Sequence, residues 1–188
     1  MPEYTDEDIA ARVQAGDRES FGLLVERYEA KMTRYARRFL FDVDEVQDVV
    51  QDVFIKAYVN LKSLDTKRRF SPWLYRIAHN EFVNTLKKKK REKVSFLNLD
   101  VFFPHLKSPD VLETDIDRKD IQETINLHLG EIDPKYREPL ILYYMEELDY
   151  KEIAEVLHVP VSTVGVRLGR AKNMLKKIVE QKSYGKFK

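Results

Sequence analysis

The sequence of 188 residues contains no cysteine, and this absence excludes several kinds of chemistry. A chain without thiols has no disulfide framework, no thiolate zinc or iron–sulfur site and no cysteine nucleophile. Only 6 glycines and 7 prolines are present, which excludes collagen-like, Gly/Ser-linker and Pro-rich polymers. No window approaches 18 uncharged apolar residues, and the first residues lack the cationic start and apolar stretch of a signal peptide. We therefore expect a soluble, cytoplasmic protein without membrane insertion.

The charged residues nearly cancel over the whole chain but separate strongly along it. The net charge is +1, yet residues 1–60 carry −5, residues 61–95 carry +8, residues 96–155 carry −9 and residues 156–188 carry +7. This alternation predicts two basic surfaces that attract a polyanion, each preceded by an acidic block that can face a different partner. For any one block the alternative is a solvated helix face.

Apolar residues recur at helical spacing along most of the chain, which predicts an all-α fold. Three helices are expected in the first half, over residues 21–39, 46–61 and 71–86. Asp17 can cap the first of them, and Ser71 followed by Pro72 suits the start of the third. No alternating strand pattern is present.

The helical spacing lapses after residue 94, where apolar residues mix with two prolines. The predicted organisation is therefore a small helical domain over residues 1–94, a flexible linker over 95–115 and a second small helical domain over 116–188. The linker contains Phe96, Phe102 and Phe103, so we expect its side chains to dock on another surface rather than form a purely solvated tether.

The second domain has the pattern of a helix-turn-helix. Asp133 before Pro134 predicts one helix start, and Asp149 with Glu152 predicts a capping box at another. A turn through His158 then leads to a longer helix whose core side is formed by Val164, Leu168, Ala171, Leu175 and Val179. If the backbone at His158 has a positive φ, histidine tolerates it better than a branched residue does.

The other side of this longer helix carries small, hydroxyl-bearing and basic residues. They are Ser162, Thr163, Gly165, Val166, Arg167, Arg170 and Lys172. Small residues at the amino end allow close approach to base edges, and the cations pair with phosphates. An ordinary helical hairpin with a charged face is the alternative.

The first domain offers two further surfaces. Asp48, Gln51 and Asp52 lie within one helical turn on the side that the apolar stripe leaves free, so they can meet a partner together, although an exposed acidic face is often only solvated. The basic and aromatic candidates for a nucleic-acid strand are Lys67, Arg68, Arg69, Phe70, Trp73, Tyr75, Arg76, Asn80, Asn84, Lys87 and Lys88.

Two roles are open for several of these candidates. Aromatic rings can stack on unpaired bases while cations hold the phosphates of an extended strand. Phe70 and Trp73 can equally be core residues, and Tyr75 is ambiguous in the same way. The cations from Lys87 onward can also serve only to complement the helix dipole, although six charges exceed that need.

Four segments together carry a resemblance to one protein family. DYKEIAEVLHVPVSTVGVRLGRAK resembles the minus-35 recognition segment of bacterial extracytoplasmic-function (ECF) sigma factors of RNA polymerase, and DPKYREPLILYYMEELDY resembles the helix before it. DEVQDVVQDVFIKAYVNLKSLD resembles the helix that binds the polymerase clamp, and FSPWLYRIAHNEFVNTLKKKKR resembles the segment that opens and reads minus-10 DNA. The segments follow the family order over nearly the whole chain.

The resemblance implies a sigma factor that binds core RNA polymerase through Asp48, Gln51 and Asp52 and directs promoter recognition, minus-10 melting and transcription initiation. It implies that the loop over residues 64–70 holds a base flipped out of the DNA near Asn80. The partners would be core polymerase and promoter DNA, duplex at the minus-35 element and single-stranded at the minus-10 element, and an anti-sigma factor is left open. No cofactor, metal or catalytic residue is implied.

Two other classes of function are alternatives to this one. A helix-turn-helix repressor or activator would bind DNA without being a polymerase subunit, and an adaptor would bind only proteins. An enzyme is disfavoured because the four histidines form no H-E-x-x-H pair and no phosphate-binding glycine loop is present. The sequence also departs from the family pattern at Gly165, Gly169 and His158, where a lysine, a larger polar residue and a glycine are usual.

Overall fold

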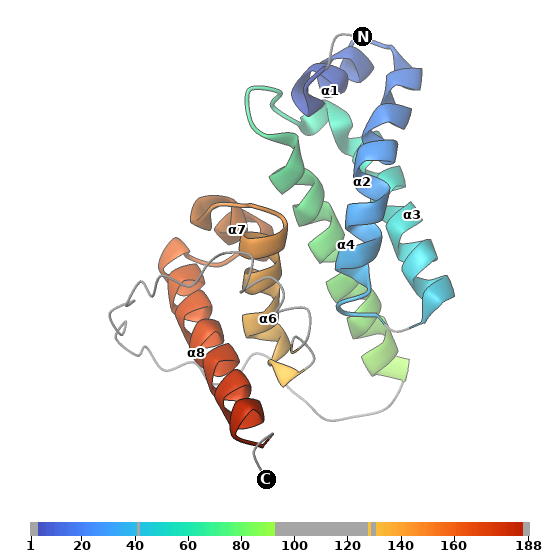
Figure 1. Cartoon of the computed structure of the whole chain (residues 1–188). Helices are drawn as coiled ribbons and strands as arrows, with labels where there is room; N and C mark the ends of the chain where they lie inside the picture. Colours follow the sequence, from blue (N-terminus) through green and yellow to red (C-terminus); the bar gives the residue numbers. More distant parts are fainter. Residues whose placement is uncertain (1–3, 41, 93–127, 129–130, 186–188) are drawn as a thin grey trace. The chain divides into compact units, whose positions relative to one another are not determined.

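The computed structural model describes residues 4–40, 42–92, 128 and 131–185, and all their side chains except those of residues 89–92, 134 and 182–185 (Figure 1). Every regular element in these ranges is helical, which confirms the all-α class. No helix within them is long and apolar enough to cross a bilayer. The chain divides into two compact units, Met1–Leu97 and Asn98–Lys188. The predicted linker lies outside the described residues.

The first unit is built from four α-helices: α1 (Asp6–Gln14), α2 (Phe21–Ala36), α3 (Val43–Asn60) and α4 (Phe70–Glu92). Two short 3-10 helices, η1 (Arg18–Ser20) and η2 (Leu61–Ser63), precede α2 and follow α3. Helix α3 packs against both α2 and α4, while α1 contacts α2, α4 and η2 (Figure 1). The segment that joins α3 to α4 therefore lies beside α1.

The apolar stripes seen in the sequence form the core of this unit. All seven residues of the second predicted stripe are buried: Val46, Val49, Val50, Val53, Phe54, Ala57 and Leu61. Asp17 accepts a hydrogen bond from the Ser20 backbone N–H and caps η1, not α2 as predicted, because η1 lies between Asp17 and α2. The Ser20 hydroxyl and Arg12 also donate to its carboxylate, and together they hold the pKa of Asp17 below its ordinary value.

Two features of this unit differ from the sequence expectations. Helix α4 begins at Phe70, so Ser71, the predicted cap, and Pro72, the predicted first residue, both lie inside it; the Phe70 N–H donates instead to the Glu7 carboxylate at 2.8 Å. Helix α1 was not predicted, although Thr5 and Asp8 form a reciprocal capping box at its start. A carboxylate 63 positions away in the chain thus does the capping that the sequence pattern assigned to local residues.

The second unit contains α6 (Pro134–Leu140), the π-helix η4 (Ile141–Met145), α7 (Tyr150–Leu157) and α8 (Val161–Gly185). The side chain of Asp133 accepts from the Lys135 N–H, which confirms the predicted cap before Pro134. The wide π turn follows Pro139, which lacks the N–H that a regular helical bond requires. Helix α8 packs against α6 and α7.

The helix-turn-helix geometry is present in α7 and α8. Asp149 and Glu152 form the predicted capping box at the start of α7. His158 ends α7 in the left-handed conformation, at φ 53°, so the positive φ considered from the sequence is confirmed. The predicted core side of α8 is buried from Val164 to Leu175, but Val179 is 38% exposed and its assignment to the core is wrong.

Candidate nucleic-acid interface

A cationic turn joins the two longest helices of the first unit. Lys67, Arg68 and Arg69 are exposed on it. The turn is closed by the Arg68 N–H, which donates to the Asp65 carbonyl at 2.9 Å, and the Asp65 side chain accepts from the Lys67 N–H at 3.0 Å. Local hydrogen bonds of this kind favour a turn over a helix. Three consecutive cations are thereby presented outside the core.

The three aromatic candidates are not on this surface. Phe70 and Tyr75 are each 1% exposed, and Trp73 is 8% exposed. Phe70 packs edge-on against Tyr28 at 5.4 Å between ring centroids, and Tyr75 packs against Tyr35 at 5.2 Å. Of the two roles that the sequence left open for these rings, base stacking or core packing, the structure has the core role, because burying the rings stabilises the unit more than leaving them exposed would.

The polar candidates on α4 do share one exposed side. Asn80, Asn84, Lys87 and Lys88 are exposed, and Arg76 is half-buried at the start of the same stripe. Since an α-helix rises 1.5 Å per residue, the stripe from Arg76 to Lys88 is about 18 Å long. Amide groups read base edges and ammonium groups hold phosphates, so a strand of several nucleotides suits this surface.

One cation near this stripe was not singled out from the sequence. Lys56 on α3 forms an ion pair with Glu81 on α4, at 2.5 Å between Nζ and Oε2. The Glu81 side chain is 12% exposed and the Lys56 side chain 49% exposed. The two residues lie 25 positions apart in the chain and on different helices, so the local charge pattern does not predict their ion pair.

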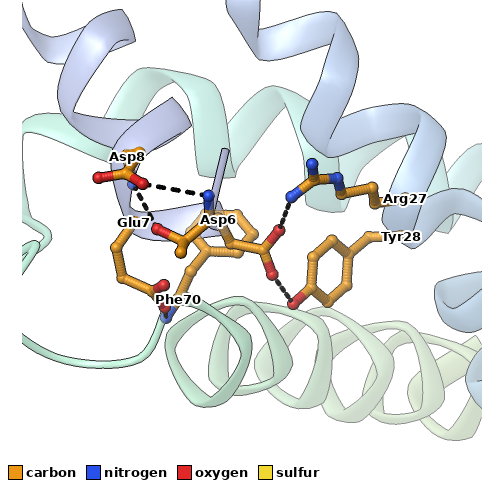
Figure 2. Close-up of polar contacts among 7 residues, drawn as sticks. Asp6, Glu7, Asp8, Arg27, Tyr28 and Phe70 are labelled. Carbon is orange, nitrogen blue, oxygen red and sulfur yellow. Dashed lines mark hydrogen bonds and ion pairs between the residues drawn. The ribbon is translucent and has the colours of Figure 1, made fainter. Parts of the chain in front are cut away.

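Both ends of the cationic turn are attached to helix α1. The Gln14 side-chain amide donates to the carbonyl oxygens of Leu61 and Leu64, at 2.8 and 2.9 Å. Glu7 accepts from the Phe70 N–H at the other end (Figure 2). Neither residue could be identified from the sequence, because hydrogen bonds across 47, 50 and 63 positions leave no periodic pattern.

The carboxyl cluster at the start of α1 is itself fixed to α2 (Figure 2). Asp6 accepts from the Arg27 guanidinium at 2.7 Å and from the Tyr28 hydroxyl. Burial, followed by the hydrogen bond to the Asp6 carboxylate, raises the pKa of Tyr28 far above its ordinary value. The Tyr28 hydroxyl therefore remains a donor at every pH at which proteins are normally handled.

The acidic candidates lie on α3. Asp48, Gln51 and Asp52 are all exposed, as expected from the apolar stripe on the opposite side of the helix. Their spacing places them within one helical turn. The three side chains are therefore available to one partner at the same time.

An apolar groove lies beside Gln51, between α2 and α3. Its volume is about 560 Å³, and Phe21, Gln51 and Ile55 are among its lining residues. Ile55 is 53% exposed, and the neighbouring Val59 is 70% exposed. Exposed apolar side chains next to charged ones are typical of a surface that binds another protein.

In the second unit, the candidate side chains on the amino-terminal half of α8 are exposed or half-buried. Ser162 is exposed, and Thr163, Val166 and Arg167 are half-buried. Arg170 is also half-buried, and its guanidinium donates to the Tyr136 hydroxyl at 3.4 Å. These side chains supply the hydroxyl, apolar and cationic groups that reading a duplex groove requires.

Lys172 lies on a different side of α8 from Arg170 and is half-buried. Two residues turn an α-helix by about 200°, so these two cations face different sides of α8. The Lys172 ammonium lies 5.7 Å from the centroid of the Tyr144 ring. Burial alone would lower the pKa of Lys172, but the hydrogen bond to Tyr144 and the nearby tyrosine hydroxyls outweigh it, and the pKa is raised. The Lys172 ammonium therefore stays charged beside these tyrosines.

Comparison with known proteins gives one consistent result. Residues 24–92 match the family Sigma-70 region 2, and residues 124–175 match Sigma-70, region 4. The chain is 34% identical over 174 residues to the ECF RNA polymerase sigma factor SigW of Bacillus subtilis, covering 88% of this chain and 92% of SigW. It is 34% identical over 185 residues to the ECF RNA polymerase sigma-E factor of Escherichia coli K12, covering 92% and 93%. The structure of CnrH in complex with the cytosolic domain of CnrY matches 94% of this chain and 97% of CnrH, with a TM-score of 0.67 and 27% identity.

Proposed function

The chain belongs to the ECF sigma factors, the subunits that direct bacterial RNA polymerase to promoters, and we propose that its two units divide promoter recognition between them. The observation that supports this division most strongly is the similarity to SigW, which extends over 92% of that protein and not over one domain alone. A repressor or activator that acts without polymerase needs only the helix-turn-helix. The likeness of both units, in the same order, favours a polymerase subunit.

The proposed polymerase contact is the acidic face of α3 with the adjoining groove. The carboxylates of Asp48 and Asp52 would pair with basic residues of the polymerase clamp, and Gln51 would add a hydrogen bond. The groove and the exposed Ile55 would supply apolar area at the centre of the contact. Charge would then orient the two proteins, and apolar burial would hold them.

The proposed minus-10 contact is the cationic turn together with the exposed stripe of α4. The turn would hold a base flipped out of the single-stranded element, with Asn80 near it. The stripe would follow the phosphates of the same strand. Since Phe70, Trp73 and Tyr75 are core residues, base capture would depend on polar and backbone groups of the turn and on the cations beside it.

The proposed minus-35 contact is the amino end of α8, with Ser162, Thr163, Val166, Arg167 and Arg170 toward the duplex. The polymerase would supply the catalytic chemistry, and the chain would act where the polymerase does, in the cytoplasm. CnrH was solved bound to the cytosolic domain of CnrY, which supports a protein regulator as a further partner of this chain. An anti-sigma factor is the class of regulator we propose.

Reconstitution with purified core RNA polymerase tests the function directly. The chain should copurify with core enzyme and direct run-off transcription from a subset of a random promoter library, with two enriched elements upstream of each start site. Core enzyme without the chain is the control. Absence of both association and start-site selection would contradict the proposal, whereas DNA binding without polymerase association would favour a repressor.

Replacing Arg167 by alanine should weaken recognition of the minus-35 element. The loss should be about 1 to 3 kcal/mol if the guanidinium reads a base, and it should then relax specificity at one position of the element. If the loss of affinity is smaller, is the same for every DNA sequence and comes with a shallower dependence of affinity on salt, then Arg167 contacts a phosphate. Holoenzyme affinity for promoter fragments with single base changes distinguishes these results.

Replacing Gly165 by alanine should stabilise the second unit while weakening its DNA binding. A Cβ at this position would meet the Tyr150 ring at 3.7 Å, which is ordinary contact, so the fold itself does not require glycine. Alanine in a helix is favoured over glycine by about 0.5 to 1 kcal/mol. Thermal unfolding should show the gain, and binding of a minus-35 duplex should show the loss if DNA approaches the backbone here. Unchanged DNA binding would contradict the close approach.

A further inference from the structure

Helix α1 is attached to the first unit along its whole length. Its inward-facing side chains, those of Ile9, Ala10 and Val13, are buried. At its first residue, Asp6 accepts hydrogen bonds from Arg27 and Tyr28 of α2. The helix is therefore a fixed support rather than a loosely held terminus. Neither the family likeness nor the charge pattern gives this helix a role in promoter binding.

The two side chains that reach from α1 to the cationic turn are spaced to span it. Glu7 and Gln14 are seven residues apart, which is two helical turns, so they lie on one side of α1 about 10 Å apart. Gln14 holds the carbonyls of Leu61 and Leu64 before the turn, and Glu7 holds the Phe70 N–H after it. Leu64 and Phe70 are also buried, so the attachment points are fixed by packing as well.

Only residues 65–69 lie between the two attachment points, and all but Thr66 are exposed. A segment whose ends are fixed has fewer conformations to lose when it closes on a ligand. The carboxylate of Glu7 also replaces the missing acceptor at the first turn of α4 and complements its dipole. The conformational entropy of the turn is therefore lost when the unit folds and not when DNA binds.

We propose that Glu7 and Gln14 are positioning residues that hold the turn of residues 65–69 open for the flipped minus-10 base. This inference rests on the proposed function, because it assigns the turn to base capture. The two residues act on DNA through the turn, and they contact neither the nucleic acid nor the polymerase. Their loss should lower selectivity for the captured base without lowering the affinity for polymerase.

Amide hydrogen exchange of the full chain tests the attachment itself. In Glu7→Ala the Phe70 amide should exchange about tenfold faster, because its acceptor is gone. Glu7→Gln keeps an oxygen acceptor at the same place and should stay near the wild-type rate. Gln14→Leu removes the side-chain amide that donates to the carbonyls of Leu61 and Leu64 and keeps a side chain of similar size. In this variant the Leu64 amide should exchange faster. Unchanged exchange in both Glu7→Ala and Gln14→Leu would overturn the proposal.

Binding of single-stranded minus-10 oligonucleotides to the holoenzyme tests the consequence. The probe is a set of oligonucleotides with an abasic nucleotide at each position in turn, and the measured quantity is the affinity ratio between intact and abasic strands. Wild type should show a large ratio at one position. Glu7→Ala and Gln14→Leu should reduce that ratio by about fivefold to tenfold, while Glu7→Gln should retain it.

Val13→Ala is the matched control, because it loosens α1 through a buried side chain that makes no bond to the turn. It should lower the melting temperature while leaving the affinity ratio unchanged. An equal loss of the ratio in Val13→Ala would show a merely structural effect and overturn the proposal. A wild-type holoenzyme without any such ratio would overturn base capture itself, whereas a wild-type ratio kept by Glu7→Ala and Gln14→Leu would overturn only the role of α1.

Discussion

The double variant Asp48→Arg, Asp52→Arg should lose binding to core RNA polymerase. Both carboxylates are exposed on one turn of α3, so the exchange replaces two attractive contacts with two repulsive ones without touching the core. Like charges brought together at an interface cost about 3 to 5 kcal/mol, which corresponds to a fall in affinity of about a hundredfold or more. Affinity for core enzyme, measured by fluorescence anisotropy of the labelled chain, gives the result.

A control variant with the same change of charge elsewhere on the unit shows whether the loss of polymerase binding is specific to the acidic face of α3 or follows from the added positive charge alone. Glu19→Arg, Glu26→Arg places two arginines on exposed positions of η1 and α2 that do not line the groove, and it should retain polymerase binding. Both variants should unfold near the wild-type temperature, because surface substitutions usually change stability by less than about 0.5 kcal/mol. Tight binding by the Asp48, Asp52 variant would remove α3 from the proposed contact.

The sequence predicted those parts of the fold that depend on neighbours in the chain. Apolar spacing identified the buried side of α3, and local caps identified the starts of α6 and α7 at Asp133 and Asp149. The turn after α7 was placed at His158, whose backbone has the positive φ that the sequence analysis had considered there. Each of these features is decided within about one helical turn, where periodicity and capping rules apply.

The sequence failed where contacts between distant residues decide the outcome. Whether Phe70 stacks on a base or packs in the core depends on Tyr28, which lies 42 positions earlier. The capping of α4 depends on Glu7, and the direction of Lys172 depends on Tyr144. Composition and spacing singled out the basic and aromatic residues as a group, and the packing shows which of them face outward.

Replacing Phe70 by alanine should destabilise the first unit severely. The ring is 1% exposed and lies against Tyr28 and Trp73, so its removal leaves a cavity in the core. Such a change costs about 3 to 5 kcal/mol, which should lower the melting temperature of a unit of this size by more than about 10 °C. Trp73 is the only tryptophan of the chain, so its fluorescence during urea unfolding reports on this unit alone.

Lys67→Ala, three residues earlier, is the matched comparison because only its backbone N–H takes part in the turn. It should unfold like wild type and bind minus-10 DNA more weakly at every sequence, with a salt slope shallower by about one unit if the ammonium holds a phosphate. If Phe70 stacked on a base instead, Phe70→Ala would also keep its stability and lose only DNA binding. We expect Phe70→Ala to lose stability and Lys67→Ala to keep it. This pair of results would show that Phe70 belongs to the core and that Lys67, three residues earlier, serves DNA binding, as their burial predicts.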